Sequence, residues 1–412
     1  MSNQKDIVIV SAKRTPIGSF LGNLSSISAP ELGGIVIKSI LDETGIDPNA
    51  IHEVIMGNVL SAGQGQAPAR QAAISAGLPS SVECFTVNKM CGSGLKSVML
   101  ASHAIQAGDA EIIIAGGMEN MSKAPYLLPN SRKGSRLGHD QILDSMIIDG
   151  LWDVYNDKHM GDCAETCATE KKYTRELQDL FAQESYARAQ AAQSNGAFEN
   201  EIVPVIIDQK KGDSIIIEKD EEPAKADFEK MKLLKPVFKK NGTITAANAS
   251  KINDGAAALL LMTRGKAKEI GLEVMATIIS QSSSAHDPEW FTTAPIGAIS
   301  NILNKVSLEP NSIDLWEINE AFAVVPMAAI DKFSLNHNIV NVNGGAIAMG
   351  HPIGASGARI LTTLIYAMKN KNAKTGVASL CIGGGEASAS VSYTHLRAHE
   401  TEADLVCRLL LE

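Results

Sequence analysis

Residues 85–120 read FTVNKMCGSGLKSVMLASHAIQAGDAEIIIAGGMEN, and this stretch decides the fold. A short strand-like run over residues 85–88 enters a glycine-rich turn. A helical pattern over 92–107 follows, and then a continuous apolar strand over 112–116. Unbroken apolar runs of this kind are typical of strands buried on both faces. The order strand, helix, strand therefore predicts an α/β protein with a mostly parallel sheet covered by helices.

The second half of the chain repeats this order of elements. Residues 314–323 (DLWEINEAFA) correspond to residues 54–63 (VIMGNVLSAG). Residues 340–368 (VNVNGGAIAMGHPIGASGARILTTLIYAM) contain a second glycine-rich turn before a helix, and an apolar strand follows. We therefore predict two duplicated α/β halves. Halves packed back to back would bring Cys91 and His351 to one site from opposite sides.

The segment between the halves differs from them in composition. It contains proline, glycine and polar clusters, a charge-rich run at 210–240 and a helical pattern at 177–192. Because that helix carries apolar residues at helical spacing, we predict an inserted domain rather than a linker. The expected organisation is an N-terminal half at 1–121 and 252–272, a loop domain at 122–251 and a C-terminal half at 273–390.

Residues 391–412, VSYTHLRAHETEADLVCRLLLE, resemble neither the end of a strand nor a capped helix. The run VSYTHLRAHET can be encoded by a nucleotide string similar to a transposon-end adapter used for sequencing libraries. The run DLVCRLLLE is similar to the primer end of the same adapter. We therefore predict that residues 391–412 are translated adapter that replaces the natural last strand residues, and we leave them out of the fold prediction. Cys407 would then have no function.

Composition limits the classes of function. Lys and Arg number 37 against 46 Asp and Glu, a net charge of −9. An acidic chain without basic blocks is not expected to bind nucleic acid or an anionic membrane. The six cysteines include no C-x-x-C pair and are too sparse for a disulfide scaffold, which favours reduced thiols. Because residues 1–18 lack a signal-peptide or transit-peptide pattern, we expect a cytoplasmic protein.

Cys91 lies between the strand-like run and the helix, in NKMCGSGLK (88–96). Nucleophilic cysteines react as thiolates, and a helix N-terminus lowers the pKa of a thiol. Gly92 and Gly94 would let backbone and substrate approach closely. A lone cysteine is, however, more commonly a buried packing residue. This stretch alone supports a nucleophile and a packing residue equally.

Three further residues belong with Cys91. His351 lies in the second glycine-rich turn, where a neutral imidazole can accept a thiol proton and later bind an oxyanion. Cys381 ends a strand before three glycines, whose N–H groups can form an oxyanion nest, although packing is its commoner role. Asn319 follows a strand, and it could hold an oxyanion-binding water or cap the next helix.

The segment HMGDCAETCA (159–168) carries another cysteine pair. Cys163 and Cys167 are four residues apart and share one helix face. No further ligands with zinc spacing accompany them, so we interpret the pair as packing. His159, beside Met160, is the stronger functional candidate in this segment.

Together these segments resemble the thiolase family. The motifs NKMCGSGLK, AGGMENMS, HMG, NDGAAA, NEAFA, GGAIAMGHPIGASGAR and CIGGG occur in family order, from about residue 5 to about residue 390. The HMG motif and the run NGTITAANAS are most similar to the short-chain, biosynthetic branch. The resemblance implies a thiolase-like fold, with two similar α/β halves and a loop domain that holds coenzyme A.

The resemblance also implies individual roles. Cys91 would be the acyl-accepting nucleophile, His351 the base that activates it, and Cys381 the acid and base of the condensation step. Asn319 would hold an oxyanion-hole water beside His351. The backbone N–H groups of Cys91 and Gly383 would form a second oxyanion hole. The expected contacts of the acyl group and coenzyme A are His159, Met160, Phe238, Ala249, Ser250 and Phe322.

The activity implied by the resemblance is the reversible condensation of two acetyl-CoA molecules to acetoacetyl-CoA and CoA. It would follow a ping-pong route through an acetyl thioester on Cys91, as part of lipid metabolism, in a homodimer or homotetramer. The expected partners are acetyl-CoA, acetoacetyl-CoA and CoA, and no cofactor would be required. Some family members bind potassium, for which Tyr186 and the carbonyls near Ala246 are the candidate ligands here.

Some positions depart from the family pattern. Where relatives often carry basic or hydroxyl residues for the nucleotide, this chain reads DEEPAKADFEKMK (220–232), so Lys225 and Lys230 are only candidates. Phe291 and Thr292 stand where many bacterial relatives have Met-Gly beside the acyl pocket. This difference concerns the shape of the pocket and not the chemistry.

Three alternatives remain beside this interpretation. A 3-ketoacyl-CoA thiolase of fatty acid degradation would accept longer chains, whereas His159 favours four-carbon substrates. A non-catalytic coenzyme A- or lipid-binding relative would lack Cys91, His351 or Cys381, yet all three are present. A cysteine protease is compatible with Cys91 and His351 alone, but no protease-like segment accompanies them.

Overall fold

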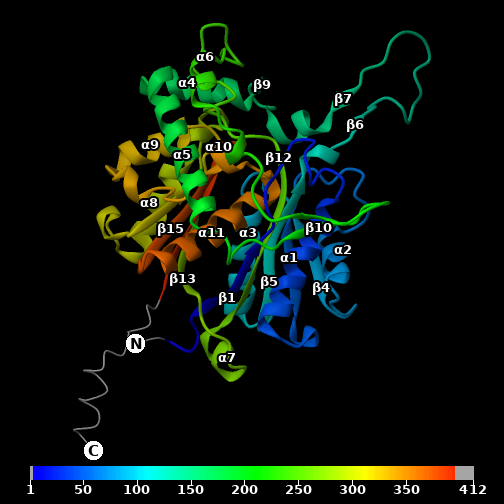
Figure 1. Ribbon diagram of the computed structural model, residues 1–412, viewed down its shortest axis with the longest axis vertical. Coiled ribbons are helices and arrows are strands. Elements are labelled where there is room, and N and C mark those ends of the chain that lie inside the picture. Colours follow the sequence, from blue (N-terminus) through cyan, green and yellow to red (C-terminus); the bar gives the residue numbers. More distant parts are fainter. Residues whose placement is uncertain (1–2, 395–412) are drawn as a thin grey trace, which may run out of the picture.

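One mixed sheet of ten strands runs through the computed structural model, which describes residues 3–394 (Figure 1). Its N-terminal strands and its C-terminal strands lie side by side. The order across the sheet is β14 (Leu315–Ile318), β15 (Thr375–Ile382), β16 (Glu386–Tyr393), β13 (Ala276–Ala285), β1 (Ile7–Arg14), β12 (Asn253–Thr263), β5 (Ile112–Asn120), β3 (Glu53–Gly57) and β4 (Glu83–Val87), with β2 (Gly18–Ser19) paired to β12.

The predicted duplication is visible in the pairing of the strands. In the N-terminal half, β3 lies parallel to β4 and β5, and β12 lies between β5 and β1. In the C-terminal half, β14 is parallel to β15 and bridges Val340 in parallel, and β16 lies between β15 and β13. The halves join where β1 pairs with β13 at Val8–Thr277 and Ile9–Ala276. The expected fold class is confirmed.

The helices lie against the faces of this sheet in three layers, one inner layer and two outer layers. The inner layer is α3 (Ser93–Ala107) and α11 (Ile353–Asn370), which share one apolar cluster with strand residues such as Ile9 and Leu380. The alternate side chains of these strands point to the opposite face of the sheet, toward the outer layers, because successive side chains of a strand face opposite sides. The outer layers are α1 (Ala29–Thr44) and α2 (Pro68–Ser75) on one half, and α8 (Ala294–Val306) and α9 (Val324–Phe333) on the other.

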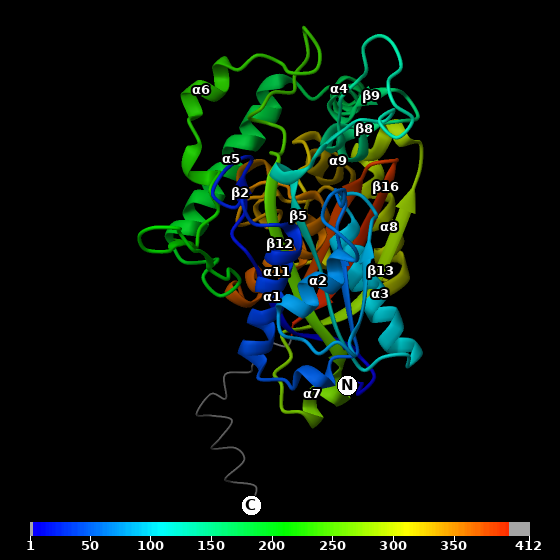
Figure 2. The same ribbon diagram turned by 90° about the vertical axis from the view of Figure 1, so that its right-hand side faces the viewer.

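The inserted segment folds over the ends of both halves (Figure 2). Its longer helices are α4 (Met160–Lys171) and α5 (Arg175–Ser194), and α6 (Phe228–Leu233) is short. Its short strand pairs are β6 (Tyr126–Leu127) with β7 (Leu143–Asp144), β8 (Trp152–Asp153) with β9 (Lys158–His159), and β10 (Val205–Ile207) with β11 (Ile215–Ile217). The remaining helices of the chain are α7 (Arg264–Glu269) and α10 (Ala346–Met349).

The buried side chain of Arg14 connects the inserted segment to the N-terminal half through ion pairs. Arg14 ends β1, and its Nε lies 2.6 Å from Glu201 Oε1 and its Nη1 2.7 Å from Asp220 Oδ1. The guanidinium also lies 4.9 Å from the centre of the Phe198 ring. All of these partners belong to the inserted segment, so the charge of Arg14 is neutralised only when that segment is docked.

The expected boundary at residue 391 lies inside a strand. Strand β16 continues to Tyr393, and Val391 pairs with Ser280 of β13 and Val377 of β15. Residues 391–393 therefore form the end of a strand, which corrects the interpretation that the run from Val391 does not resemble one. The rest of the predicted adapter tail, residues 395–412 with Cys407, lies outside the described residues. Among residues 3–394, none of the helices is both long and apolar enough to cross a membrane.

Candidate active site

Cys91 is presented on a tight turn between β4 and α3. The residue before it, Met90, has a φ of +46°, a left-handed conformation that is unfavourable for a residue with a side chain. The turn is held by side chains: Asn88 Oδ1 accepts from Met90 N at 3.1 Å, and Ser93 Oγ accepts from Lys89 N at 2.9 Å and donates to the Met90 carbonyl at 2.6 Å. The orientation of Cys91 is thus fixed at some cost in backbone energy.

Close packing of α3 against α11 brings the two glycine-rich turns together. A Cβ on Gly94 would lie 2.7 Å from the backbone N of Ala358, and one on Gly357 would lie 2.3 Å from the backbone N of Leu95. Neither distance is compatible with a side chain, so both glycines are required by the approach of the helices. Cys91 precedes one of these helices and His351 precedes the other.

His351 is buried and oriented by neighbouring hydrogen bonds. Its backbone N donates to Asn253 Oδ1 at 2.9 Å, and its Nδ1 lies 2.6 Å from Ser356 Oγ. Ser356 has one hydroxyl proton, and it donates this proton to the Pro352 carbonyl at 2.9 Å. Both contacts of Ser356 are satisfied when His351 carries its proton on Nδ1. Nε2, which has no partner within residues 3–394, is then free to accept a proton.

Burial keeps the His351 imidazole neutral. It lowers the pKa of His351 to about 3, and the nearby positive charge of Arg359 lowers it further. A neutral imidazole is the form that can act as a base. The predicted protonation state therefore agrees with the environment of the ring.

Cys381 and Gly383 reach the same place from the end of β15. Cys381 is fully buried, and burial together with the proximity of Cys91 raises its pKa well above the usual thiol value. The backbone N–H of Gly383 interacts with the Cys91 sulfur. A Cβ on Gly92 would lie 2.3 Å from Ile382 Cδ1, so the Cys91 turn packs directly on this strand. An ion pair between Lys89 and Glu386 also joins the two segments.

The expected effect of the helix terminus on Cys91 is wrong. Burial of the thiol raises the pKa of Cys91 to about 11, although the N–H groups of Gly383 and Cys91 itself lower it. Desolvation disfavours the thiolate more than the hydrogen bonds favour it. Since Glu119 adds a further unfavourable charge, Cys91 is a neutral thiol near neutral pH. The His351 imidazole is neutral as well.

Asn319 directly follows β14, and its backbone N donates to the Ser379 carbonyl at 2.9 Å. The N-cap of the next helix, α9, is Ala323, so the capping role considered for Asn319 is wrong. Both polar atoms of the Asn319 side chain are buried without a partner within residues 3–394. The same holds for His351 Nε2. The Glu317 carboxylate accepts no hydrogen bond within residues 3–394, although its Oε2 lies 3.7 Å from Arg359 Nη1. Buried polar atoms of this kind are usually satisfied by ordered water.

An aromatic wall lines the approach to these residues. The His159 ring stacks on Phe238 with 4.8 Å between centroids, and His159 Nδ1 accepts from Gly161 N at 3.0 Å. Phe322 contacts Phe238 and Phe291 edge-on, each at 6.2 Å. Met160 is buried beside them, and its sulfur would lie 3.7 Å from a Cβ on Gly383. Phe291, one of the two positions that depart from the family pattern, is therefore part of this aromatic wall.

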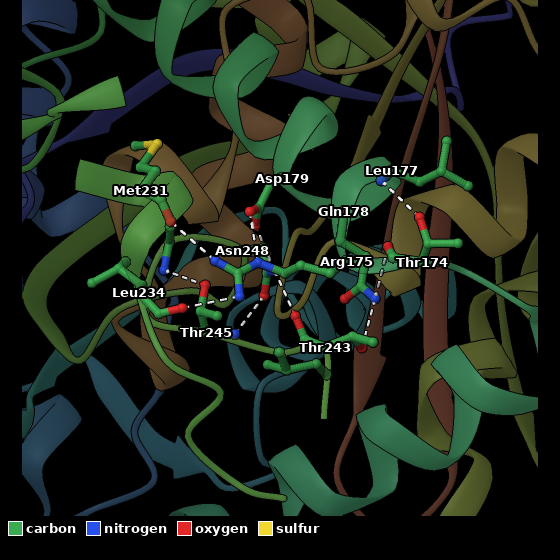
Figure 3. Close-up of polar contacts among 12 residues, drawn as sticks. Thr174, Arg175, Leu177, Gln178, Asp179, Met231, Leu234, Thr243, Thr245 and Asn248 are labelled. Atoms are coloured by element: carbon green, nitrogen blue, oxygen red, sulfur yellow. Dashed lines mark hydrogen bonds and ion pairs between the residues drawn. The ribbon is translucent and has the colours of Figure 1, made fainter. Parts of the chain in front are cut away.

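The other two expected coenzyme A contacts lie on an adjacent segment. Ala249 bridges Phe322, and Ser250 N donates to the Ala321 carbonyl at 2.9 Å. This segment is pinned to α5 through Asn248, whose Nδ2 donates to Asp179 Oδ1 at 2.9 Å and whose Oδ1 accepts from Thr245 N at 2.8 Å (Figure 3). The expected substrate residues thus lie on one wall, although they come from distant parts of the chain.

Glu119 is a site residue that the sequence reasoning missed. It is fully buried at the end of β5, and its carboxylate accepts from the backbone N atoms of Val59, Leu60 and Gly354 at 2.9–3.2 Å. Burial raises its pKa to about 7, against these hydrogen bonds. Because Gly354 lies in the first turn of α11, Glu119 ties the His351 turn to the N-terminal half. Its position after two glycines, in GGMEN, was the available signal.

Other candidates have structural partners. Cys163 and Cys167 are buried in an apolar cluster of α4, in agreement with the packing interpretation, and residues 3–394 contain no group of three or more metal-ligating side chains. Lys225 contacts Ser19 and lies 3.4 Å from Glu222 Oε1, so its charge is partly neutralised within the chain. Lys230 is exposed on α6.

The expected potassium ligands do not fit a metal ion. Lys251 Nζ donates to the Ala246 carbonyl at 2.5 Å and lies 5.5 Å from the centre of the Tyr186 ring. A positive charge is therefore already present at the oxygen that potassium would need. Two unit charges about 4 Å apart repel each other by about 4 kcal/mol at an effective dielectric constant near 20.

The fold and this geometry define a class of protein. Two similar α/β halves pack together through α3 and α11, the helices that follow Cys91 and His351, and Cys381 lies close to Cys91. The chain matches the description "Thiolase, N-terminal domain" over residues 7–265 and "Thiolase, C-terminal domain" over residues 272–393. The chain belongs to the thiolase family, as its sequence motifs predicted.

Individual relatives are similar over almost their whole length. An acetyl-CoA acetyltransferase of Cupriavidus necator is 55% identical over 381 residues, which cover 92% of this chain and 97% of the relative. Acetyl-CoA acetyltransferase 2 of Arabidopsis thaliana is 52% identical over 391 residues, 94% of this chain and 97% of the relative. The crystal structure of Acat5 thiolase from Ascaris suum in complex with coenzyme A superposes with a TM-score of 0.90 at 44% identity, covering 95% of this chain and all of that one.

Proposed function

We propose that this protein is an acetyl-CoA C-acetyltransferase, which condenses two acetyl-CoA molecules reversibly to acetoacetyl-CoA and CoA. The observation that carries the proposal is the proximity of Cys91, Cys381 and the Gly383 N–H, together with the close packing of α3 on α11, the helices that follow Cys91 and the neutral His351. The names of relatives that are 50–55% identical support the same substrate.

The first stage transfers an acetyl group to Cys91. Cys91 Sγ gives its proton to His351 Nε2 and attacks the thioester carbonyl. The N–H groups of Cys91 and Gly383 stabilise the oxyanion, and each such donor is typically worth about 3–4 kcal/mol. When the tetrahedral intermediate collapses, coenzyme A leaves with a proton from Cys381. Cys91 is then acetylated, His351 is protonated and Cys381 is a thiolate.

The second stage forms the carbon–carbon bond. The Cys381 thiolate removes a proton from the methyl group of a second acetyl-CoA, and its raised pKa makes it a strong base for this step. Protonated His351 and a water held by Asn319 stabilise the enolate oxygen. The carbanion attacks acetyl-Cys91, and the Cys91 thiolate that leaves regains its proton from His351. All three side chains return to their starting forms.

Two variants test these roles. Cys91→Ala should prevent labelling of the protein by radioactive acetyl-CoA, because no acyl acceptor remains. Cys381→Ser should still be acetylated on Cys91, although more slowly, because the thiolate of coenzyme A can leave without a proton. Condensation and thiolysis should fall by at least about a hundredfold, since a hydroxyl is a far weaker acid and its alkoxide does not form to act as the base. Normal condensation by Cys381→Ser would refute the assignment.

The aromatic wall supports a short acyl group. His159, Phe238, Phe322 and Phe291 form a continuous contact series beside Met160, and we propose that these rings limit the length of the acyl chain. Thiolysis should therefore be much faster with acetoacetyl-CoA than with ten-carbon or longer 3-ketoacyl-CoA. Comparable rates would favour a broad 3-ketoacyl-CoA thiolase instead.

We also propose a cytoplasmic homodimer or homotetramer that acts in lipid metabolism. The support for an oligomer is β4, which ends the sheet and has one edge without a partner strand among residues 3–394. Such edges commonly pair with another copy or are otherwise covered. Light scattering after size-exclusion chromatography would determine the assembly, and a monomer at micromolar concentration would contradict this part of the proposal.

A further inference from the structure

The position expected for potassium contains a side-chain cation. Lys251 lies just before β12 and turns its ammonium toward the Ala246 carbonyl, 2.5 Å away, above the face of the Tyr186 ring. The carboxylate of Glu222 lies close enough to act on both Lys251 and Tyr186. A carbonyl oxygen, an aromatic face and a nearby carboxylate are the partners of a bound monovalent cation.

Burial lowers the pKa of Lys251, but the negative charge of Glu222 raises it and opposes this loss. The ammonium form is also the one that the Tyr186 ring attracts. The Ala246 carbonyl, the Tyr186 ring and the Glu222 carboxylate therefore compensate part of the cost of burying the ammonium.

We propose that the Lys251 ammonium is the resident cation of this position, that it positions the segment 245–250 for coenzyme A, and that the enzyme consequently works without potassium. The part concerning coenzyme A rests on the proposed function. Lys251 does not itself contact the reacting atoms, so it is a positioning residue.

The connection to the substrate wall runs through a short segment. Thr245 and Asn248 are fixed to the α5 side by the hydrogen bonds in Figure 3. Between them, the Ala246 peptide carries the carbonyl that Lys251 holds. Ala249 follows directly and bridges Phe322. The loss of the Lys251 contact would therefore loosen the backbone immediately before the expected coenzyme A contacts.

Thermal unfolding tests cation occupancy without any substrate. Melting temperatures are measured in potassium, sodium and N-methylglucamine chloride at one ionic strength, for the native protein and for Lys251→Ala. An ion that binds only the folded state raises the melting temperature. We expect no potassium-specific shift for the native protein and a rise of a few degrees for Lys251→Ala. A potassium-specific rise in the native protein, or none in Lys251→Ala, would overturn the proposal.

Steady-state thiolysis in the same salts tests the positioning role. Lys251→Ala in N-methylglucamine should show about a fivefold higher KM for coenzyme A with kcat within about twofold, and potassium should restore most of the loss. Lys251→Arg, which keeps the cation, should resemble the native protein, as should the matched surface control Lys38→Ala. An unchanged KM in Lys251→Ala, or a fall in kcat alone, would refute positioning.

Failure of the proposed function and failure of the proposal for Lys251 would give different results. If the native protein showed no thiolysis of acetoacetyl-CoA, the proposed function would be wrong, while the melting experiment would still test the resident cation. If thiolysis were normal but rose several-fold with potassium, the proposed function would stand and the role of Lys251 would be wrong.

Discussion

At the scale of single residues, Cys91 is a neutral thiol and His351 a neutral imidazole before substrate binds. Burial separates the two pKa values, to about 11 for Cys91 and about 3 for His351. Transfer of the proton between them is therefore unfavourable until a substrate carbonyl is present to take up the charge. Unlike a permanent thiolate–imidazolium pair, this arrangement protects Cys91 from unrelated electrophiles.

Alkylation kinetics test this resting state. The rate at which iodoacetamide modifies Cys91, followed by peptide mass spectrometry, should rise about tenfold per pH unit between about pH 6 and 9, because the reactive thiolate fraction rises in this way below the pKa. Cys84→Ala, which removes another partly exposed thiol, should leave the profile unchanged. A plateau below about pH 8 would show a thiolate stabilised by an ion pair.

A second residue-scale prediction concerns Asp254. Burial raises its pKa to about 6 from 3.8, and its oxygens accept from Ser122 N at 3.0 Å and Ser122 Oγ at 2.6 Å. A raised carboxyl pKa favours folding below the unfolded pKa, and this contribution is lost as pH rises through the folded pKa. Asn can make both contacts without a charge. Asp254→Asn should therefore be more stable at about pH 8, by up to ~3 kcal/mol from a shift of about two pKa units.

Urea unfolding at two pH values measures this difference. The gain of Asp254→Asn should disappear near about pH 4, where the native carboxyl is itself protonated. Asp42→Asn, on the exposed face of α1, should show no such pH dependence. An equal effect of Asp254→Asn at both pH values would show that packing and not ionisation is responsible.

The sequence predicted the chemistry-bearing residues better than their electrostatics. Cys91, His351 and Cys381 could be found because they lie in glycine-rich turns with a recognisable order. The positive φ of Met90, the buried Glu119 and the cation of Lys251 depend on contacts between residues far apart in the chain. The raised pKa of Cys91 has the same origin, since burial by the opposite half outweighs the local effect of a helix terminus.

At the scale of elements, the crossing of α3 and α11 positions the site. Gly357→Ala would place a Cβ 2.3 Å from a backbone atom that cannot rotate away. We expect a loss of about 1–3 kcal/mol in the free energy of unfolding and a lower kcat, because the helices that present Cys91 and His351 must separate.

The matched control is Gly265→Ala on α7. The new Cβ would there face Gln4 near the chain end, with nearest atoms at 3.2–3.6 Å. The free energy of unfolding should change by less than about 0.5 kcal/mol, and kcat should not change. If Gly357→Ala behaved like this control in urea unfolding and thiolysis, the helix contact would not be limiting.

The positions of several helices and strands could be predicted from the periodicity of apolar residues. The predicted helix at 92–107 corresponds to α3, and the helical pattern at 175–195, whose apolar positions span 177–192, corresponds to α5. The run at 112–116 is the first part of β5. The two-residue strands of the inserted segment could not be predicted, because they are too short to show a period. Nor could the pairing of residues 391–393 in β16, since only their neighbours β13 and β15 make that stretch a strand.

At the scale of the whole molecule, Arg14 links the inserted segment to the sheet. Arg14→Met would leave Glu201 and Asp220 buried without their cation, and breaking a buried pair in this way typically costs about 3–5 kcal/mol. The melting temperature should fall, and limited proteolysis should accelerate between residues 196 and 240. Lys38→Met, at an exposed ion pair, serves as the control. Equal proteolysis rates in both variants would contradict this role.

The sheet order has a consequence for synthesis on the ribosome. Strand β16 follows every other strand in the described chain, yet it lies between β13 and β15 and not at an edge. The C-terminal half therefore cannot close its sheet until this last strand has been made. Cys91 emerges early, whereas Cys381 and the strand that buries it emerge at the end. A nascent chain thus carries the Cys91 thiol before Cys381 and β16 are available. We expect catalytic activity to appear only after release, when β16 pairs with β13 and β15.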